Sequence, residues 1–443
     1  MKKFQALFGA DMRKEIVAGL TGFFAISYII IVNPMILADG GIPADLSVFA
    51  TIFSSVLGCL IMAFYADAPI ILTPGMGINA FFTYTVVASM GLAWQEAIAI
   101  SLVSGVLFAV VACTRLRTLL ADAVPASLKT AITVGIGLFL VEIGLEKAQL
   151  IRRGTNTIIE LGDLTNPMVL LALFGLVLSL AFYLRRVTGG FVLAILIVSS
   201  AAYALGLRDA QPVTIELSRI TSYPALFAQF DFSHLLSVPF LLSVFSMAMI
   251  MIFESLGILE GILPDKTKFD RTFRGSAAAA LFSSFLGTSP TVVAAESATG
   301  IASGGRRGGM ALVAAILFAA SMFFVPLLSF VPQAAIAPVI IITGAMMMQN
   351  LARMDFSDFT EWFPAFLIVV LIPLTGSIST GLAFGFTAWP LLKFLAGARK
   401  DVHAVSACLG LLFFLQLGLP SFLLKKYQRG RFPIAGKRPL CVE

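Results

Sequence analysis

The chain has 443 residues, of which 59% are hydrophobic and only 12% are charged. An ordinary soluble domain carries about 25% charged residues, so a water-soluble fold is excluded because it could not bury this much apolar surface. The net charge of +6 comes from basic residues scattered among short segments, which argues against a nucleic-acid-binding face and favours a role in membrane orientation.

Apolar stretches of about 20 residues, the length that a helix needs to cross a bilayer, recur along the chain. They are continuous rather than alternating, which favours helices over barrel strands. After a basic N-terminal segment, 1–15, seven spans are expected at 16–37, 47–66, 70–90, 96–114, 126–146, 167–184 and 190–207. A polar, strand-like loop, 208–233, precedes seven more at 235–263, 275–288, 289–304, 309–330, 334–351, 361–375 and 377–396.

The basic residues predict the orientation of these fourteen spans. If the N-terminus is cytoplasmic, seventeen Lys and Arg lie in inner loops and five in outer loops, as the positive-inside rule requires. We therefore expect a multi-pass protein of the cytoplasmic membrane, with a lipid bilayer as its surroundings. Many spans follow the first, so a cleaved signal is not expected. In the C-terminal region, 397–443, the apolar stretch 404–419 precedes a basic tail, and we expect an interfacial or packed segment there.

An odd number of spans in each half gives the two halves opposite orientations, as in transporters built from inverted repeats. Two short similarities favour such a repeat. Residues 104–108 are similar to 314–318, and the Pro125-Ala126 pair is similar to Pro332 and Ala334. The offsets, 210 and 207 residues, agree with one another.

Two expected spans are broken by proline and glycine. The third contains Thr-Pro-Gly-Met-Gly-Ile-Asn-Ala-Phe-Phe at 73–82, and the tenth contains Thr-Ser-Pro-Thr-Val-Val-Ala-Ala-Glu-Ser-Ala-Thr-Gly at 288–300. Such segments are expected to be part extended and part half-helix. Close packing of small residues would also explain one of them. A matched pair in corresponding positions of two halves instead favours a binding site near the membrane midplane.

Two acidic residues fall in this territory, Glu254 in the eighth span and Glu296 behind the break in the tenth. An ionised carboxylate at the bilayer centre costs about 2.5 to 3.5 kcal/mol on insertion scales, so such residues persist mainly for a function. Low dielectric favours the neutral form, which makes each a candidate proton acceptor. A protonated or paired glutamate that bonds neighbouring backbone is the structural alternative. Asn79 offers donors and an acceptor for a polar heterocycle, and Phe81 or Phe82 could stack on a ring or simply pack.

Other polar residues are assigned lesser roles. Three acids, Glu142 and Glu146 of the fifth span and Glu260 at the inner end of the eighth, are expected at a gate or rim. The two histidines, His234 and His403, are expected at the surface. The four cysteines, at 59, 113, 408 and 441, lack metal-ligand spacing and are expected to be small core residues. No metal or other cofactor is expected.

At this point the sequence resembles a known family. The run 21–37 with Tyr28 and Asn33-Pro34, the run 74–82 and the run 288–301 resemble AzgA-like purine permeases, of the xanthine/uracil permease family in the nucleobase–ascorbate transporter superfamily. The likeness covers about 13–397. It implies an all-α membrane fold of fourteen spans in two inverted sevens. A core domain would comprise 16–114 and 235–330, and a gate domain 126–207 and 334–396.

The resemblance also implies proton-coupled uptake of a purine nucleobase: adenine, guanine, hypoxanthine or xanthine. By position, Asn79, Glu254 and Glu296 would bind the base, the two glutamates would also carry the proton, and Phe82, Thr291 and Ser297 would complete the site. The eighth span departs from the family, because it reads Phe-Glu-Ser-Leu-Gly-Ile at 253–258 where Phe-Asp-Thr-x-Gly-Thr is usual. Glu260 and the tail beyond 425 are also atypical. The base preferred, the proton stoichiometry and a homodimer stay open.

Three alternatives stay open at this point. A uracil or anion carrier could share the architecture, although two buried acids and no buried Arg or Lys at the site argue against an anion. An intramembrane enzyme would need a nucleophile with a base, or a metal cluster, and neither His nor Cys accompanies the candidate acids. A receptor that does not transport is excluded by no feature of the sequence.

Overall fold

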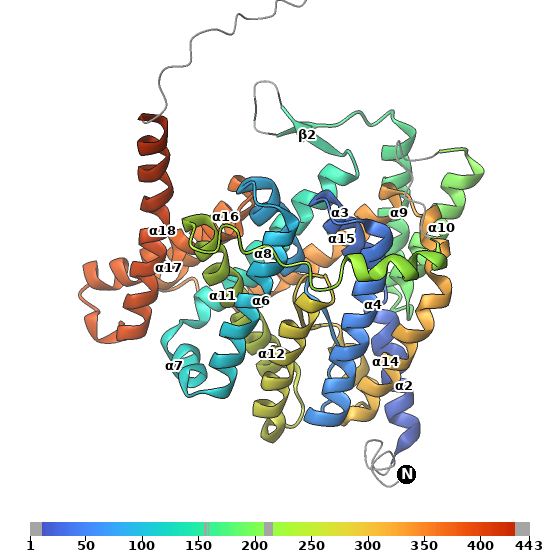
Figure 1. Ribbon diagram of the computed structural model, residues 1–443, viewed down its shortest axis with the longest axis horizontal. Helices are drawn as coiled ribbons and strands as arrows, with labels where there is room; N and C mark the ends of the chain where they lie inside the picture. The colour runs from blue at the N-terminus through green and yellow to red at the C-terminus, as the bar shows by residue number, and fades with distance from the viewer. Residues whose placement is uncertain (1–10, 155–156, 158, 208–215, 430–443) are drawn as a thin grey trace, which may run out of the picture.

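The structure is a computed structural model that describes residues 11–154, 157, 159–207 and 216–429. Parts of three expected segments lie outside the described residues: 1–10 of the N-terminal segment, 208–215 of the long loop, and the tail 430–443 with Cys441. Figure 1 shows an assembly of helices, most of them running between the end that carries the N-terminus and the end that carries strand β2.

The first half consists of helices with short interruptions. Its elements are α2 (Met12–Ile26), α3 (Ile29–Asp39), α4 (Ala44–Ile61), the π-helix η1 (Met62–Ala66), β1 (Leu72–Pro74), α5 (Met76–Ala80), the π-helix η2 (Phe81–Ser89), α6 (Trp94–Cys113), α7 (Leu116–Ala123), α8 (Ala126–Lys147), β2 (Ile151–Arg153), β3 (Ile159–Leu161), α9 (Pro167–Leu184) and α10 (Gly190–Ala204).

The second half has the same character. Its elements are the 3₁₀-helix η3 (Leu217–Ala225), α11 (Val238–Ile262), η4 (Lys266–Lys268), α12 (Phe269–Phe285), β4 (Thr291–Val293), α13 (Ser297–Ala302), α14 (Gly308–Ser321), η5 (Met322–Phe330), α15 (Gln333–Met348), η6 (Gln349–Arg353), α16 (Phe359–Thr375), α17 (Ile378–Leu395), η7 (Arg399–Asp401) and α18 (Ala404–Arg429).

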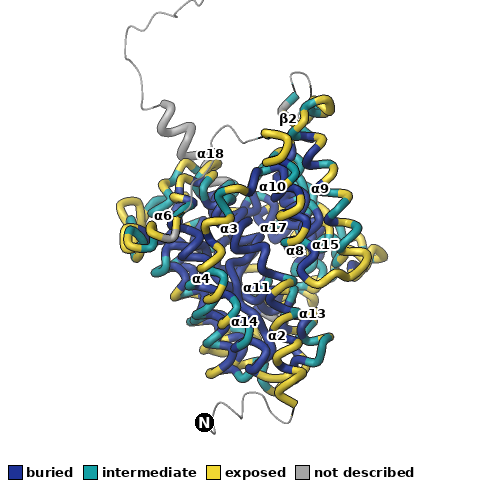
Figure 2. Tube along the Cα trace, turned by 90° about the vertical axis from the view of Figure 1, so that its right-hand side faces the viewer, coloured by how far each residue is buried: buried dark blue, intermediate teal, exposed yellow. Residues whose placement is uncertain are grey.

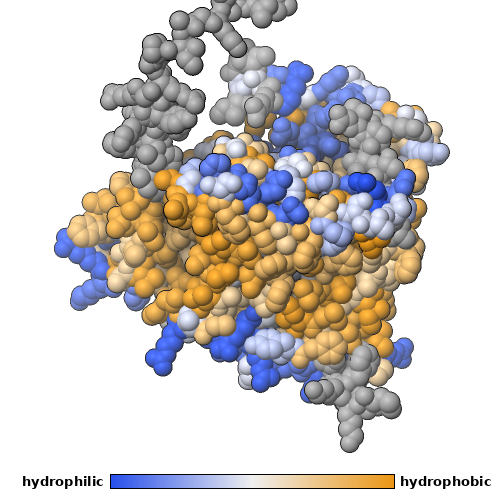
Figure 3. Space-filling view, in the orientation of Figure 1, coloured by the Kyte–Doolittle hydropathy of each residue, from blue (hydrophilic) through white to orange (hydrophobic). Residues whose placement is uncertain are grey.

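The helices fit a membrane protein. Within the described residues, nine helices are long and apolar enough to cross a bilayer, and three shorter helices are apolar. Figure 3 shows a broad apolar belt between two polar ends, as a protein surrounded by lipid requires. The span expected at 275–288 begins earlier, at Phe269. Its first turns contain charged residues, so a search for apolar stretches did not include them.

The strands differ in part from expectation. The loop expected to be strand-like, 208–233, is 3₁₀-helix η3 and turns where it is described. Its backbone bonds partly within the segment, as where the Arg219 amide donates to the Glu216 carbonyl, and partly to other segments, as where the Ala228 amide donates to the Phe285 carbonyl. Instead β2 and β3 form an antiparallel hairpin in the segment between α8 and α9, which the sequence did not predict.

Helices α8 and α15 cross at very close range. A Cβ built on Gly137 would lie 2.6 Å from the Gly344 carbonyl oxygen, and one built on Gly344 would lie 2.4 Å from the Gly137 carbonyl oxygen. Both helices follow a proline at the N-cap, Pro125 and Pro332. The two prolines and the two glycines are each 207 residues apart, so the contact is reciprocal in position as well as in space.

The described part of the C-terminal region packs on the bundle. Phe413 of α18 is fully buried, with its ring 4.9 Å from that of Phe386 on α17 and 4.8 Å from that of Phe245 on α11. Of the expected core cysteines, Cys59 is buried, but Cys113 and Cys408 are exposed on helices of the apolar belt. A small thiol is tolerated there because lipid, not water, faces these helices.

Candidate functional site

The two broken segments meet in the middle of the molecule. Strand β1 pairs antiparallel with β4, with Thr73 opposite Val292 and Pro74 opposite Thr291. The Gly75 amide donates to the Pro290 carbonyl at 3.2 Å. Non-helical backbone inside a membrane must satisfy its own polar groups, and each strand here does so through the other. The half-helices α5 and α13 follow the paired strands, as proline and glycine in both segments predicted.

Ser297 and Thr291 lie at this crossing, but Ser297 is already engaged. Its hydroxyl accepts from the Ile71 amide at 3.0 Å and lies 3.4 Å from the Ile71 carbonyl, so it ties the start of α13 to the approach of β1. Thr291 is buried, and its methyl group would lie 3.2 Å from a Cβ on Gly58. Its hydroxyl oxygen is buried without a hydrogen-bond partner among the described residues. Thr291 is therefore the freer of these two expected substrate contacts.

The two acids come from different helices and lie close to one another. Glu254 projects from α11, Glu296 immediately precedes α13, and the two carboxyl groups are near enough for their charges to interact. Both residues are partly exposed. Glu254 Oε2 is buried and has no hydrogen-bond partner among the described residues. Figure 2 shows α11 in the buried centre of the molecule and α13 nearer the end that carries the N-terminus.

Glu296 has a partner that was not among the predicted site residues. The hydroxyl group of Tyr28 donates to Glu296 Oε1 at 2.6 Å. Tyr28 lies in the short break between α2 and α3 and is fully buried. The signal was present in the sequence, since Tyr28 is a polar side chain within a long apolar run, but a tyrosine in such a run can also be an interfacial or packing residue.

Asn79 belongs to a polar cluster beside the crossing. Ser289 donates to Asn79 Oδ1 and also approaches Asn33 Oδ1 at 3.4 Å. The amide of Asn33 donates to Thr51 at 2.8 Å and to Thr288 at 3.1 Å. Asn79 is fully buried, and its Nδ2 has no hydrogen-bond partner among the described residues. Its carbonyl is therefore occupied, and the two donor hydrogens of Nδ2 are what it could offer a ligand.

Phe82 is fully buried in η2, so its ring presents no exposed face here. Stacking on a ligand ring stays a prediction for this residue. His234, expected at the surface, lies on an exposed segment and contacts the carboxylate of buried Glu96 at 2.6 Å. Among the described residues, no group of three His, Cys, Asp or Glu side chains is placed to hold a metal ion.

Four exposed residues follow the two acids along their helices: Gly257 and Gly261 of α11, and Ala298 and Thr299 of α13. We refer to these four residues as the inner opening. A Cβ built on either glycine would meet no atom within 4 Å. Space is therefore left beside both glycines, which follow Glu254 along α11.

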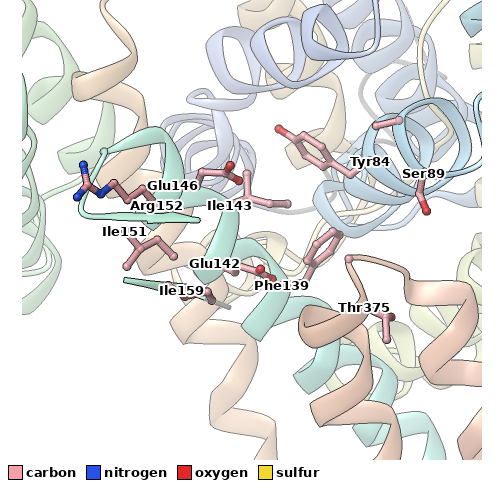
Figure 4. Close-up of a pocket in the computed structure, with 12 residues that line it drawn as sticks. Tyr84, Ser89, Phe139, Glu142, Ile143, Glu146, Ile151, Arg152, Ile159 and Thr375 are labelled. Atoms are coloured by element: carbon pink, nitrogen blue, oxygen red, sulfur yellow. The ribbon is translucent and has the colours of Figure 1, made fainter. Parts of the chain in front are cut away.

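A separate cavity of about 370 Å³ lies at the end of the molecule that carries strand β2, and Figure 4 shows the residues that line it. It is lined by residues of η2, α8, the β2–β3 hairpin and the α16–α17 turn, among them Tyr84, Phe139, Glu142, Glu146 and Arg152. The expectation that the two acids of α8 lie at a rim agrees with this position. We call this cavity the outer cavity; it does not contain Glu254 or Glu296.

Tyr84 and Phe139, which line the outer cavity, take part in contacts beside it. Asp39, at the end of α3, accepts from the Tyr84 hydroxyl at 2.6 Å and pairs with the Lys147 ammonium at 2.6 Å. The ring of Tyr84 also meets that of Phe139 edge-on, with centroids 6.2 Å apart. The contacts of Lys147 and Phe139 join helix α8 to α3 and η2.

Comparison with known proteins shows to which family the chain belongs. The model of a family described as the Permease family, Xan_ur_permease, matches residues 13–384. The chain belongs to this permease family. The permease is 39% identical to the nucleobase transporter PlAzg2 of Paenibacillus larvae over 87% of its own length and 78% of that protein. It is 36% identical to the guanine/hypoxanthine permease PbuO of Bacillus subtilis over 92% of its own length and 97% of that protein.

The similarity extends to the adenine permease AdeQ of Escherichia coli, which is 31% identical over 92% of this chain and 94% of that protein. These relatives confirm the resemblance to AzgA-like permeases. The permease is therefore a multi-pass membrane transporter rather than an enzyme. The fold is shared with the membrane domain of the cyanobacterial bicarbonate transporter BicA, at a TM-score of 0.60 and 16% identity over 83% of this chain and 96% of that one.

Proposed function

We propose that the permease takes up a purine nucleobase, adenine, guanine, hypoxanthine or xanthine, together with a proton. The printed names of the relatives support a nucleobase as the substrate. The observation that carries the proposal is the pair of neighbouring, partly exposed acids, one of which has a buried oxygen without a hydrogen-bond partner among the described residues. A uracil or anion carrier of the same fold is the alternative, and an anion is disfavoured because no cation among the described residues acts on either acid.

In the proposed complex the base lies near the ends of α5 and α13. Glu254 and Glu296 accept hydrogen bonds from ring N–H groups, while backbone amides and Asn79 donate to its carbonyl or ring nitrogens. Hydrogen bonds to charged groups contribute about 1.5 to 3 kcal/mol each, which is enough for two of them to orient a flat polar ligand. Phe82 and Thr291 complete the site once the gate moves, and Ser297 supports it by holding the backbone. A proton on one acid neutralises the loaded site.

We also propose that the chain crosses the membrane fourteen times as two inverted sets of seven spans, with the N-terminus cytoplasmic. The packing of the helices supports this repeat. Helix α6 (span 4) contacts α12 (span 9), and the equivalent helix of the second half, α14 (span 11), contacts α4 (span 2). The reciprocal contact of Gly137 and Gly344 falls on the proposed gate helices, with the offset of the sequence repeat. The core domain comprises spans 1–4 and 8–11, and the gate domain spans 5–7 and 12–14.

With this orientation the conformation is open to the cytoplasm. We take the inner opening as the access to the two acids from the cytoplasmic side, while the contact of Asp39 with Lys147 joins core and gate on the outer side. Transport then requires the core to move against the gate, so that the inner opening closes and the acids face the outer cavity. The proton gradient favours release on the cytoplasmic side.

The test is uptake of labelled adenine, guanine, hypoxanthine, xanthine and uracil by cells that lack base permeases. Expression of the wild type should confer uptake of at least one purine, and Glu254→Gln and Glu296→Gln should each abolish it at unchanged membrane abundance. Glu260→Gln is the matched control, because Glu260 is on the same helix but exposed, and should retain uptake. Uptake of uracil alone, or normal purine uptake by either acid variant, would contradict the proposal.

A further inference from the structure

The two ends of the Tyr28 side chain contact two different parts of the molecule. Its hydroxyl group donates to Glu296 Oε1 at 2.6 Å, across 268 positions of sequence. Its ring meets the ring of Phe191 edge-on, at 5.7 Å and 88°. Phe191 belongs to α10 of the proposed gate domain and stacks in turn on Tyr183, at 6.3 Å and 5°. Tyr28 therefore spans from the site to the boundary between the two domains.

The backbone around Tyr28 is also fixed. The Ser27 amide closes α2 by bonding to the Phe23 carbonyl at 2.7 Å, and the carbonyl of Tyr28 accepts from the amides of Ile31 and Val32, each at 3.0 Å. The side chain is fully buried. A tyrosine whose backbone and ring are both held cannot swing its hydroxyl group away without repacking, so the geometry of its bond to Glu296 is preorganised.

We infer that Tyr28 is a positioning residue, which holds one oxygen of Glu296 so that the other oxygen faces the substrate. The inference rests on the proposed function of Glu296. Tyr28 itself is buried and does not touch the substrate; it acts on substrate binding only through Glu296. A carboxylate has two acceptor oxygens, and a donor on one of them fixes the direction of the other. Without this donor the Glu296 side chain would sample several rotamers, and part of the binding energy would be spent on ordering it.

Tyr28→Phe removes only the hydroxyl oxygen and keeps the ring that packs on Phe191. We expect the KM for the transported purine to rise about tenfold or more, as for loss of a hydrogen bond to a charged group, with a smaller change in the maximal rate. The pH profile of uptake should change in shape. Tyr183→Phe is the matched control, because Tyr183 stacks on the same phenylalanine without reaching Glu296. It should leave the KM and the pH profile unchanged, and a pure change in rate with an unaltered KM in Tyr28→Phe would overturn the inference.

A double-variant cycle separates positioning from packing. Glu296→Asp shortens the side chain and withdraws its carboxyl group from Tyr28, so adding Tyr28→Phe to it should change the KM less than twofold, because the shared bond is already lost. Fully additive effects would overturn the inference.

Infrared spectra of the purified, substrate-free protein supply a readout that does not depend on transport. The carboxyl band that Glu296→Gln removes should shift in Tyr28→Phe and stay in place in Tyr183→Phe. An unshifted band in Tyr28→Phe would overturn the inference. A wild type that takes up no purine would instead contradict the proposed function.

Discussion

The contact between Asp39 and Lys147 should set the balance between inward-open and outward-open states. The Lys147 side chain is 12% exposed and that of Asp39 31%, and their charged atoms are 2.6 Å apart. Two unit charges about 4 Å apart attract by about 4 kcal/mol at an effective dielectric constant of 20. Desolvation and the partial exposure of Asp39 reduce the net value to about 1–2 kcal/mol. The pair joins α3 to α8, so the proposed motion must break it.

Lys147→Met removes the charge and keeps the aliphatic stem, so its main effect should be on this equilibrium. A loss of about 1–2 kcal/mol raises the ratio of outward-open to inward-open states about 5- to 30-fold. The assay is the labelling rate of Thr299→Cys in the inner opening, in a background without the native cysteines, by an impermeant maleimide added to inside-out vesicles. The rate should fall in Lys147→Met, because the inner opening is closed for more of the time.

Two further variants make this prediction specific. Arg152→Met breaks a pair with Glu160 inside the β2–β3 hairpin, at 2.7 Å, and should leave the labelling rate unchanged. The exchange of charges, Asp39→Lys with Lys147→Asp, should restore labelling toward the wild-type rate. Wild-type labelling in Lys147→Met, or an equal fall in Arg152→Met, would refute the idea that this pair holds the outer side closed.

Two predictions concern stability in detergent, measured as the temperature of unfolding. Gly137→Ala places a methyl group against the backbone of α15, which cannot move aside as a side chain could, so the folded protein should be destabilised by about 1–3 kcal/mol. Gly261→Ala is the control, because its methyl group lies in open space and should not lower the unfolding temperature. Lys393→Met should destabilise by about 1 kcal/mol, because the ammonium pairs with Asp358 at 3.0 Å and Glu361 at 2.9 Å, and both acids are partly exposed. Lys400→Met, on an exposed residue, should have no effect, and an equal change in either control would contradict the corresponding prediction.

Much of the site could be predicted because its determinants are local. Pro74 and Pro290 lack an amide hydrogen, and neighbouring glycines weaken a helix further, so an extended break is expected at both positions. Proline alone does not decide this, since Pro364 lies inside helix α16. An acid such as Glu254 in an apolar run is likewise conspicuous, because its burial is costly. The structure adds that the two breaks pair with one another in register and that the two acids lie close together.

What could not be predicted depends on contacts between distant segments. The hydrogen bond from Tyr28 to Glu296 joins two spans that are 268 residues apart in the sequence. No sequence motif around Tyr28 indicates that its hydroxyl group contacts Glu296. The engagement of Ser297 by the Ile71 backbone follows from how α13 is docked, which hydropathy does not encode. The β2–β3 hairpin consists of strands of three residues each, too short for an alternating pattern to be recognised.

The most direct test is a measurement of proton movement in liposomes that contain the purified permease and a pH-sensitive dye. Adding a transported purine outside, without an imposed gradient, should acidify the lumen in the wild type, since each base would bring a proton with it. Glu254→Gln and Glu296→Gln should abolish both the acidification and the entry of labelled base. Entry of base without any acidification, or equal acidification in either variant, would contradict a transport cycle that depends on these two acids.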